Sequence, residues 1–291
     1  MLSLLIAVLS PWIAIVMMLI IEDIAKEIKQ RYDVDLNSFT NTLLITKINK
    51  RMSSLGITVQ QAYLDFFRKA PDEAIILLQE IGINVSSFFR NPLVYSILEH
   101  HILPAIIEAK RKKGINEIRV WSAGCASGEE PYSIAILLHQ LLKDVIKQWQ
   151  IHIFATDIDQ KILKKASKGV FSRDKLLDTR LGICDEYFTC MGEKYTLKPV
   201  IRQMVNFSFD DLISSEKIAP AASIFGSFDL VLCRNVMIYF NNSAKKVALR
   251  KFIKTLTSKS YLVLGESEWI EESEKSAFMK IDLENRIYKT K

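Results

Sequence analysis

Apolar residues recur at helical spacing along the first part of the chain. The stretch EDIAKEIKQRY places three of them four residues apart, at Ile24, Ile28 and Tyr32. The next periodic stretch, SFTNTLLITKINKRMSSLG, ends in Gly56, and glycine commonly stops a helix because it tolerates a left-handed backbone. A third stretch, TVQQAYLDFFRKAPDEAIILLQEIG, predicts one or two more helices, broken near Pro71. The pattern therefore predicts an all-α N-terminal domain over residues 22–82.

The pattern changes at residue 117, where short apolar runs begin to alternate with helical stretches. The strand-like runs lie at residues 117–121, 151–155, 228–233 and 260–264, and the helical stretches lie at residues 130–148, 159–168 and 243–257. Near-continuous apolar strands that alternate with helices are typical of a parallel sheet covered by helices. We therefore expect an α/β domain over residues 117–291, preceded by a linker and connecting helix at residues 83–116. The stretch YTLKPVIRQMVNFSF breaks the alternation and predicts a small antiparallel β insert near residues 185–209.

The first 21 residues, MLSLLIAVLSPWIAIVMMLII, contain no charged side chain. As a helix they would span about 30 Å, the thickness of the hydrocarbon core of a bilayer. They lack the basic start and the cleavage site of a secretory signal. Basic residues follow them at Lys26, Lys29 and Arg31, which favours a cytoplasmic location for the rest of the chain. Two interpretations stay open: residues 1–21 are a membrane anchor, or they pack on the following domain.

Composition sets broad limits on the class of protein. The 291 residues are 49% hydrophobic and 25% charged, which fits a folded chain of one large or two modest domains. The net charge of +6 favours an acidic partner without naming one. Lys47, Lys50 and Arg51 form a basic cluster, which is either a solvated helix face or a docking surface. The four cysteines show no metal-ligand spacing, so we expect reduced thiols and no metal site.

A glycine-containing turn follows the first predicted strand, in RVWSAGCASGEEPYSIAILL. Gly124 and Gly128 do not have the GxGxxG spacing of a dinucleotide-binding turn. Glu129 and Glu130 would repel a phosphate there, by about 1–4 kcal/mol for each nearby pair of like charges. A cationic ligand such as S-adenosylmethionine, which carries a sulfonium and an ammonium group, would instead be attracted. The alternative is that both glutamates only complement the helix dipole.

An acidic residue ends the next predicted strand, in IHIFATDID. Asp157 follows the glycine turn by about 30 residues, and a carboxylate in this place can accept both hydrogen bonds from a ribose diol. Asp159 is expected to cap the helix that follows. Asp157 is therefore either a ribose ligand or an ordinary aspartate at the entry to a helix.

Polar residues also follow the strand FDLVLC, in CRNVMIYF. Arg234 and Asn235 are costly to bury without partners, so we expect them to serve a cleft at the end of this strand. Enzymes that methylate nucleic-acid amines carry an Asn/Asp-Pro-Pro-aromatic run here, which this chain lacks. A fourth stretch, INVSSFFRNP, lies between the two predicted domains and places Arg90 after two phenylalanines that we expect in the core.

In their order and spacing, FFRN, RVWSAGCASGEEPYSIA, FATDID and CRNVMIYF resemble the chemotaxis receptor-glutamate methyltransferase family, the CheR type. The resemblance covers roughly residues 22–290, and LGESE is similar to a late strand and turn of the family. It implies a Rossmann-like S-adenosylmethionine methyltransferase domain of the α/β class, with a small antiparallel β insert and an all-α N-terminal domain before it. The insert is short at TCMGEKYTLKP, which disfavours the gripping of a receptor's C-terminal peptide seen in some members.

The resemblance also implies which residues bind the cofactor. These are Asn84, Ser86, Arg90, Gly124, Glu129, Asp157, Asp211, Leu212, Arg234 and Asn235. Glu129 would hold the methionine part of S-adenosylmethionine and Asp157 the ribose. Asp211 and Leu212 would flank the adenine, although the family usually has asparagine where Asp211 stands. Ser86 replaces a common threonine and keeps its hydroxyl.

The implied reaction transfers a methyl group to a receptor glutamate and leaves S-adenosylhomocysteine. A glutamate has a pKa near 4.3, so it is already a nucleophile at neutral pH and needs no general base. None of the four histidines falls in a motif. Arg90 and Tyr239 would line the centre of methyl transfer as the catalytic residues, with Arg90 orienting the incoming carboxylate.

Partners and location follow from the same resemblance. Methyl-accepting chemotaxis receptors have acidic helices, and Lys47, Lys50 and Arg51 would meet them in the cytoplasm. Residues 1–21 would then be a candidate link to the receptor's membrane. Two other functions stay open: a non-catalytic signalling scaffold that binds S-adenosylmethionine, and a nucleic-acid methyltransferase. A dinucleotide oxidoreductase ranks last because of the glycine spacing.

Overall fold

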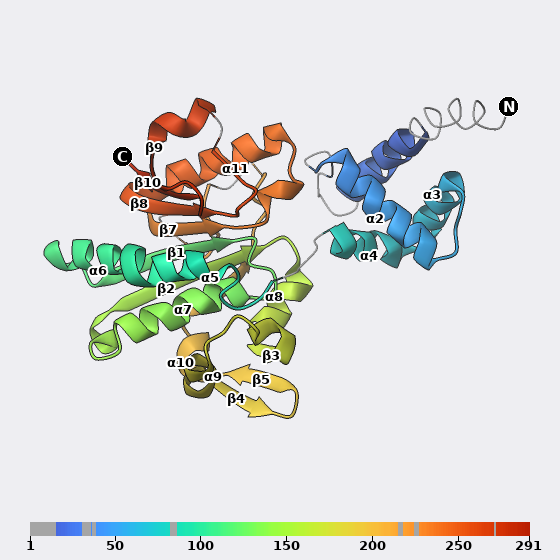
Figure 1. The fold of residues 1–291 in the computed structure, drawn as a ribbon. Helices are drawn as coiled ribbons and strands as arrows, with labels where there is room; N and C mark the ends of the chain where they lie inside the picture. The colour runs from blue at the N-terminus through green and yellow to red at the C-terminus, as the bar shows by residue number, and fades with distance from the viewer. Residues whose placement is uncertain are drawn as a thin grey trace. The chain divides into compact units, whose positions relative to one another are not determined.

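The chain divides into two compact units in a computed structural model. The structure describes residues 16–30, 36, 39–81, 86–214, 218–223, 227–270 and 272–291. The first unit comprises Met1–Ile83 and Tyr239–Ala244, and the second comprises Asn84–Ile238 and Lys245–Lys291. Figure 1 shows the first unit as helices and the second as a sheet flanked by helices. The helical unit and the sheet unit, as we name them, are described separately below.

The helical unit is built from amphipathic helices around one apolar core. Residues 16–30 are helical, and the other helices are α2 (Asn41–Ser54), α3 (Gln60–Lys69) and α4 (Pro71–Ile81). Gly56 has a φ of +67° just after α2, which confirms the predicted stop. Pro71 begins α4, where a missing N–H costs nothing, so the third stretch forms two helices. Buried residues from all four helices make the core, among them Ile24, Ile28, Leu44, Ile48, Tyr63, Phe67 and Leu77.

The described part of the apolar N-terminal segment, residues 16–21, belongs to this unit. Residues 16–21 are helical and run directly into residues 22–30. Met17, Ile20 and Ile21 are buried in the same core, so the membrane-anchor interpretation is wrong for this part and the packing alternative holds. The expected domain start at residue 22 therefore falls inside a helix, and residues 1–15 lie outside the described residues. Among the described residues, no helix is both long and apolar enough to cross a bilayer.

The sheet unit contains a large, mostly parallel sheet, as the alternation of strands and helices predicted. Its order is β6-β2-β1-β7-β8-β10-β9. The strands are β1 (Glu117–Ala123), β2 (Gln150–Asp157), β6 (Val205–Phe209), β7 (Phe228–Cys233), β8 (Leu256–Leu264), β9 (Phe278–Asp282) and β10 (Ile287–Thr290). β6, β2, β1, β7 and β8 pair in parallel, whereas β10 is antiparallel to both its neighbours. The carboxyl ends of five strands therefore lie at one edge of the sheet.

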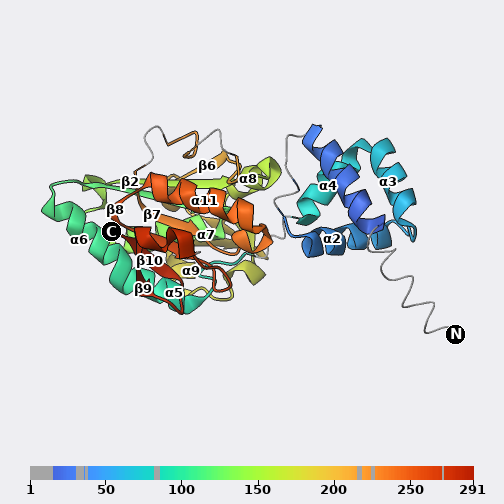
Figure 2. The ribbon, with the colours of Figure 1, turned by 90° about the horizontal axis from the view of Figure 1, so that it is seen from above.

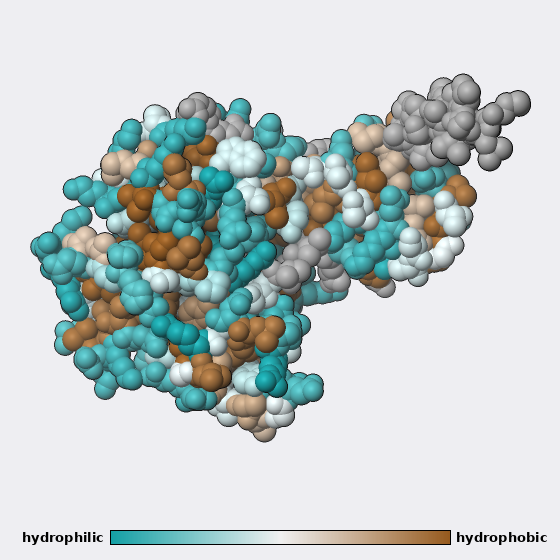
Figure 3. Space-filling view, viewed as in Figure 1, coloured by the Kyte–Doolittle hydropathy of each residue, from teal (hydrophilic) through white to brown (hydrophobic). Residues whose placement is uncertain are grey.

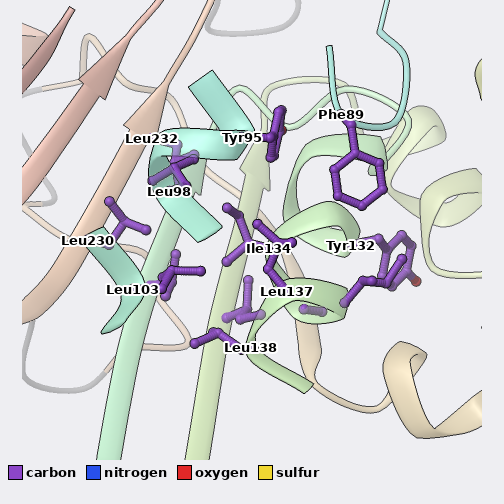
Figure 4. Close-up of a cluster of buried hydrophobic side chains, with 14 of the residues drawn as sticks. Phe89, Tyr95, Leu98, Leu103, Tyr132, Ile134, Leu137, Leu138, Leu230 and Leu232 are labelled. Carbon is purple, nitrogen blue, oxygen red and sulfur yellow. The ribbon is translucent and has the colours of Figure 1, made fainter. Parts of the chain in front are cut away.

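Helices cover both faces of this sheet (Figures 1 and 2). The helices and helical turns along this part of the chain are α5 (Pro92–Ile97), the π-helical turn η2 (Leu98–Ile102), α6 (Leu103–Lys112), α7 (Glu129–Leu141), η3 (Ile146–Gln148), α8 (Gln160–Ala166), η5 (Met237–Tyr239), α11 (Asn242–Thr255) and η6 (Glu272–Ala277). The segment Tyr239–Ala244, at the end of η5 and the start of α11, belongs to the helical unit. On one face, apolar side chains of α5, α6 and α7 pack with those of β1 and β7 (Figure 4). On the other face, Trp121 packs against Phe252 of α11, with ring centroids 5.3 Å apart.

A small antiparallel sheet forms the insert, but its boundaries differ from the prediction. Its order is β3-β5-β4, from β3 (Val170–Ser172), β4 (Phe188–Met191) and β5 (Lys194–Leu197), with η4 (Arg173–Leu176), α9 (Leu181–Tyr187) and α10 (Pro199–Arg202) beside it. The insert thus begins before residue 185. Residues 205–209 are the parallel edge strand β6 of the large sheet, so their assignment to the insert was wrong. Leu177, Leu181 and Met191 are exposed on the insert.

The surface of both units is mixed in character. Figure 3 shows brown apolar patches among teal hydrophilic side chains on the face in view. Exposed large apolar residues occur on the helical unit as well, for example Leu19 and Val59. Single apolar side chains at a protein surface are ordinary, so these residues alone mark no site.

Candidate active site

The predicted site residues gather where the parallel strands end, starting with the glycine turn after β1. Gly124 has a φ of +75°, and a Cβ there would lie 2.4 Å from Cγ2 of Val236. Only glycine therefore lets the turns after β1 and β7 approach this closely. The N–H groups of Gly124 and Cys125 both donate to the Thr156 carbonyl, which fixes the turn to the end of β2.

Glu129 is the first residue of α7, and its side chain is fully buried. The Ser127 hydroxyl lies 2.7 and 2.8 Å from its two carboxylate oxygens and can donate to only one at a time. The Lys175 ammonium lies 3.9 Å from Oε1. Burial raises the pKa of Glu129, and the hydrogen bond from Ser127 opposes that rise. A buried carboxylate whose nearest ammonium is beyond hydrogen-bond distance favours a bound cation.

Glu130 has a different place from its neighbour. Its Oε1 accepts a hydrogen bond from Ser122, and its Oε2 lies 3.6 Å from Nη1 of Arg234. Burial raises the pKa of Glu130, and the charge of Arg234 counteracts it. Of the two glutamates in the turn, one therefore pairs with the protein's own arginine, and Glu129 is the one available for a ligand.

Arg234 contacts the FFRN loop, which lies near the start of the sheet unit's sequence. Its Nη2 donates to the carbonyl of Arg90 at 2.9 Å and to Oδ1 of Asn91 at 2.7 Å. Its guanidinium also lies 5.4 Å from the centroid of the Tyr95 ring. The buried Nε of Arg234 has no hydrogen-bond partner among the described residues. Arg234 thus holds the loop that carries Arg90, and it keeps one donor for a further acceptor.

Asp157 ends β2, as predicted, and its carboxylate joins two turns. Oδ2 accepts from the N–H of Ala126 at 2.9 Å, and Oδ1 accepts from the N–H of Asp159 at 3.0 Å. Asp159 caps α8 by accepting from two backbone N–H groups, which confirms that prediction. Burial raises the pKa of Asp157, and these backbone hydrogen bonds lower it. Each oxygen still has a lone pair for a diol.

The segment after β6 is held by a lysine that the sequence reading missed. Lys251 of α11 is buried; its Nζ lies 3.4 Å from Oδ2 of Asp210 and donates to the Asp211 carbonyl at 2.9 Å. The Asp211 carboxylate accepts from the N–H of Ile213, so it closes a local turn. Leu212 is buried beside it. The adjacent aspartates were the signal for a buried cation, but nothing in the sequence pointed to α11.

A second missed residue shapes the turn after β7. Glu268, from the LGESE stretch, is buried and accepts from the N–H groups of Gly265, Asn235, Val236 and Ile238. Burial raises its pKa, and these backbone donors lower it. Asn235 has a φ of +60°, a left-handed conformation that the carboxylate fixes. Glu268 therefore holds the backbone of Asn235 in its conformation at the end of β7.

The FFRN loop brings Ser86 and Arg90 to this edge of the sheet. The Ser86 carbonyl accepts from Nζ of Lys175, which lies 3.9 Å from Oε1 of Glu129. The Arg90 carbonyl accepts from Arg234, which lies 3.6 Å from Oε2 of Glu130, so both residues lie near the glutamate turn. The two phenylalanines, Phe88 and Phe89, are buried in the core, as expected. Asn84, the remaining candidate of this stretch, lies outside the described residues.

Tyr239 is assigned to the helical unit, whereas the residues described above are assigned to the sheet unit. Its carbonyl accepts a hydrogen bond from the N–H of Thr40 at 3.0 Å, and the ring of the next residue, Phe240, packs edge-on against Phe39. These contacts involve the backbone of Tyr239 and the side chain of Phe240. The catalytic role expected of its hydroxyl remains a prediction.

The basic cluster on α2 is largely paired within the helical unit. Arg51 makes a two-pronged contact with Glu73, at 2.9 and 2.7 Å, and Glu73 is buried. Lys47 is also buried, and burial lowers its pKa. Lys50 is exposed and pairs with Glu80 at 2.8 Å. Of the three basic residues, Lys50 is therefore the one whose side chain is mostly exposed to solvent.

Comparison with known proteins agrees with this geometry. The family model described as "CheR methyltransferase, SAM binding domain" matches residues 84–287. The chemotaxis protein methyltransferase of Borreliella burgdorferi is 30% identical over 248 residues, which are 84% of this chain and 86% of that protein. That of Listeria monocytogenes is 33% identical over 251 residues, 84% of this chain and 87% of that protein.

The corresponding protein of Escherichia coli is 31% identical over 248 residues, again 84% of this chain and 82% of the relative. The matches thus extend across nearly the whole length of the relatives and include both units. The site geometry, the family model and these relatives agree that the chain belongs to the CheR methyltransferase family, whose domain binds S-adenosylmethionine.

Proposed function

We propose that this chain transfers the methyl group of S-adenosylmethionine to glutamate side chains of chemotaxis receptors and so forms methyl esters. The family and the names of its relatives support the reaction class. The observation that carries the proposal is the pair of carboxylates at the carboxyl edge of β1 and β2, buried Glu129 and half-buried Asp157. A phosphate-bearing cofactor would be repelled there, whereas a cation is attracted.

The residues fit S-adenosylmethionine. Glu129 would take its ammonium group, because burial without a full counter-charge destabilises the ionised carboxylate and a cation relieves that cost. Asp157 would accept from the ribose diol with the lone pairs that its backbone donors leave free. Leu212 offers an apolar contact for the adenine next to Asp157. When bound, the cofactor supplies a methyl group on a positively charged sulfur.

The chain's own contribution is alignment of the acceptor and exclusion of water. A receptor glutamate is ionised at neutral pH and therefore needs no base. Arg90 can orient that carboxylate with paired N–H donors, and Arg234 holds the Arg90 backbone through its carbonyl. We assign Tyr239 to the same acceptor. We also propose that Lys50, rather than the whole basic cluster, meets the acidic receptor helices.

The test uses the full chain, methyl-labelled S-adenosylmethionine and membranes that contain a chemotaxis receptor. Label should enter the receptor and leave it as methanol in mild base, because esters hydrolyse and methylated amines do not. Receptors whose methylatable glutamates are replaced by alanine are the control. A base-stable label, or label in nucleic acid, would contradict the proposal.

Tyr239→Phe separates the acceptor site from the cofactor site. The backbone bond from Thr40 to the Tyr239 carbonyl is kept in this variant, so the fold should be unchanged. We expect slower ester formation with unchanged affinity for S-adenosylhomocysteine. Equal rates for variant and wild type would remove Tyr239 from the catalytic set.

A further inference from the structure

A cation of the small insert stands beside the carboxylate that is assigned to the cofactor. Lys175 lies in η4, next to β3, and its side chain is 25% exposed. Its Nζ is 3.9 Å from Oε1 of Glu129. At this distance the two groups attract each other, but they do not form a hydrogen bond. Neither charge is therefore satisfied by the other.

Lys175 is held in this place by two backbone contacts to the FFRN side of the site. Its Nζ donates to the Ser86 carbonyl at 2.8 Å, and its own carbonyl accepts from the N–H of Phe88 at 2.8 Å. An ammonium group has three donors, and one of them is used by Ser86. Two donors remain near Glu129.

Glu129 and Lys175 together present one negative and one positive group side by side. The methionine end of S-adenosylmethionine is an amino-acid zwitterion, with an ammonium and a carboxylate on the same carbon. Such a zwitterion can lie antiparallel to the protein pair, so that each charge meets its opposite in a charge-assisted hydrogen bond. A lone carboxylate would attract the ammonium but would repel the ligand's carboxylate.

We propose that Lys175 binds the α-carboxylate of the cofactor and is the specificity residue that recognises the intact amino-acid end. The inference rests on the proposed cofactor site. It adds Lys175, which lies outside the sequence motifs that carry the family resemblance. It also gives the insert a part in cofactor binding, because η4 and β3 carry Lys175 to the site.

The experiment is calorimetry with three neutral-sulfur ligands and the full chain. S-adenosylhomocysteine has both charged groups, S-adenosyl-3-thiopropylamine keeps only the ammonium, and 5′-methylthioadenosine has neither. Lys175→Met should weaken S-adenosylhomocysteine by about tenfold or more and leave the other two within about twofold. Glu129→Gln should weaken both ammonium ligands. Lys164→Met, at an exposed lysine of α8, is the control for net charge.

Three results would overturn the proposal. Equal loss for all three ligands would show that Lys175 is only a strut for the Ser86 loop. Tighter binding of both ammonium ligands by Lys175→Met would show that it is a counter-ion which the ligand must displace. Unchanged affinity for S-adenosylhomocysteine would likewise exclude it.

Further variants keep the test decisive. Lys175→Arg retains the charge and should retain S-adenosylhomocysteine binding. Thermal denaturation shows whether Lys175→Met folds, and if it does not, Lys175→Arg and Lys175→Gln are compared instead. In that case, selective loss in Lys175→Gln against retention in Lys175→Arg supports the proposal, and parallel behaviour of the two contradicts it. Failure of wild type to bind S-adenosylhomocysteine would instead refute the proposed cofactor, so the two failures are distinguishable.

Discussion

At the scale of single residues, the buried carboxylates around the sheet edge differ in what they already hold. Glu268 accepts from four backbone N–H groups, and Glu130 pairs with Arg234. Asp157 accepts from backbone N–H groups, and Glu129 accepts from Ser127 and a backbone N–H while the nearest ammonium lies 3.9 Å away. A buried carboxylate without a counter-charge in hydrogen-bond contact gains most from a cationic ligand.

Asp157→Ala should reduce stability as well as cofactor affinity. The N–H groups of Ala126 and Asp159 lose their acceptor, which costs about 1–3 kcal/mol for each group that stays buried. Denaturant unfolding and calorimetry with S-adenosylhomocysteine measure the two effects. Asp159→Ala is the matched control, because it removes only a helix cap and should lower stability by about 0.5–2 kcal/mol with affinity unchanged. Equal affinities for all three proteins would refute the ribose assignment.

Cofactor binding should depend on pH through Glu129. Burial raises its pKa above the ordinary 4.5, so the stability of the ligand-free protein falls as the pH rises from 4.5 through that raised pKa, and the full cost of the ionised form is present above it. Below it the carboxyl is neutral and cannot attract an ammonium. The ratio of affinities for S-adenosylhomocysteine and 5′-methylthioadenosine should therefore rise as the pH rises through this pKa. Taking the ratio removes the titration of Asp157, which both ligands would share, and Glu129→Gln should give a flat ratio.

Charge reversal on α2 should have different results at neighbouring positions. Lys50→Glu leaves the core untouched and should slow receptor methylation at low salt, with S-adenosylhomocysteine binding unchanged. Arg51→Glu would face the buried Glu73 and should instead destabilise the helical unit by about 3–5 kcal/mol or more, because it leaves a buried carboxylate without its partner. Methylation rates over a salt series, with circular dichroism as the folding check, separate them. Equal rates for Lys50→Glu and wild type would leave Lys50 as a solvated residue.

At the scale of secondary-structure elements, periodicity predicted most of the fold. The four strand-like runs became β1, β2, β7 and β8, and their helices became α7, α8 and α11. β6 was misassigned because an edge strand is only half covered. Asn206 and Phe209 are exposed in it, so it lacks the continuous apolar run of a central parallel strand. A short strand's pairing partner is fixed by tertiary contacts, which a single sequence does not display.

The same limit explains what was missed at the site. The order of the motifs located Glu129, Asp157 and the turn that carries Arg234 and Asn235, because these residues lie at or soon after the ends of predicted strands. Lys175 and Lys251 come from a short 3₁₀ turn and the middle of a helix, where a lysine looks like any solvated residue. Their roles depend on which segment folds beside them.

The helix over residues 16–30 should be required for stability of the helical unit. Ile20→Ala removes side-chain contacts at a position that is 2% exposed and should cost about 2–5 kcal/mol, whereas Leu19→Ala, at 58% exposed, should cost little. Hydrogen exchange of α2, α3 and α4 measures the effect. A protein that begins at Glu22 loses Met17, Ile20 and Ile21 together and should lose protection in these helices while still binding S-adenosylhomocysteine. Full protection in that shortened protein would show that the segment is dispensable.

At the scale of the whole molecule, net charge was a weaker guide than the site. A charge of +6 suits nucleic acid as well as an acidic receptor. In the helical unit, however, the strongest basic side chain of the cluster is neutralised by Glu73. Local pairing therefore decides what a basic protein displays, and the base lability of the transferred methyl group decides between the two substrates.

The segment Tyr239–Ala244 belongs to the helical unit although it lies between β7 and the body of α11. Phe240 bridges to Phe39 and packs its ring 5.8 Å from it. A recombinant chimera that exchanges residues 1–83 with a relative would thus split this aromatic pair between two parents. We expect chimeras that also exchange residues 239–244 to melt at a higher temperature than those that do not. The helical unit is therefore encoded by two separate segments of the gene, and we expect substitutions in one segment to be accompanied by substitutions in the other.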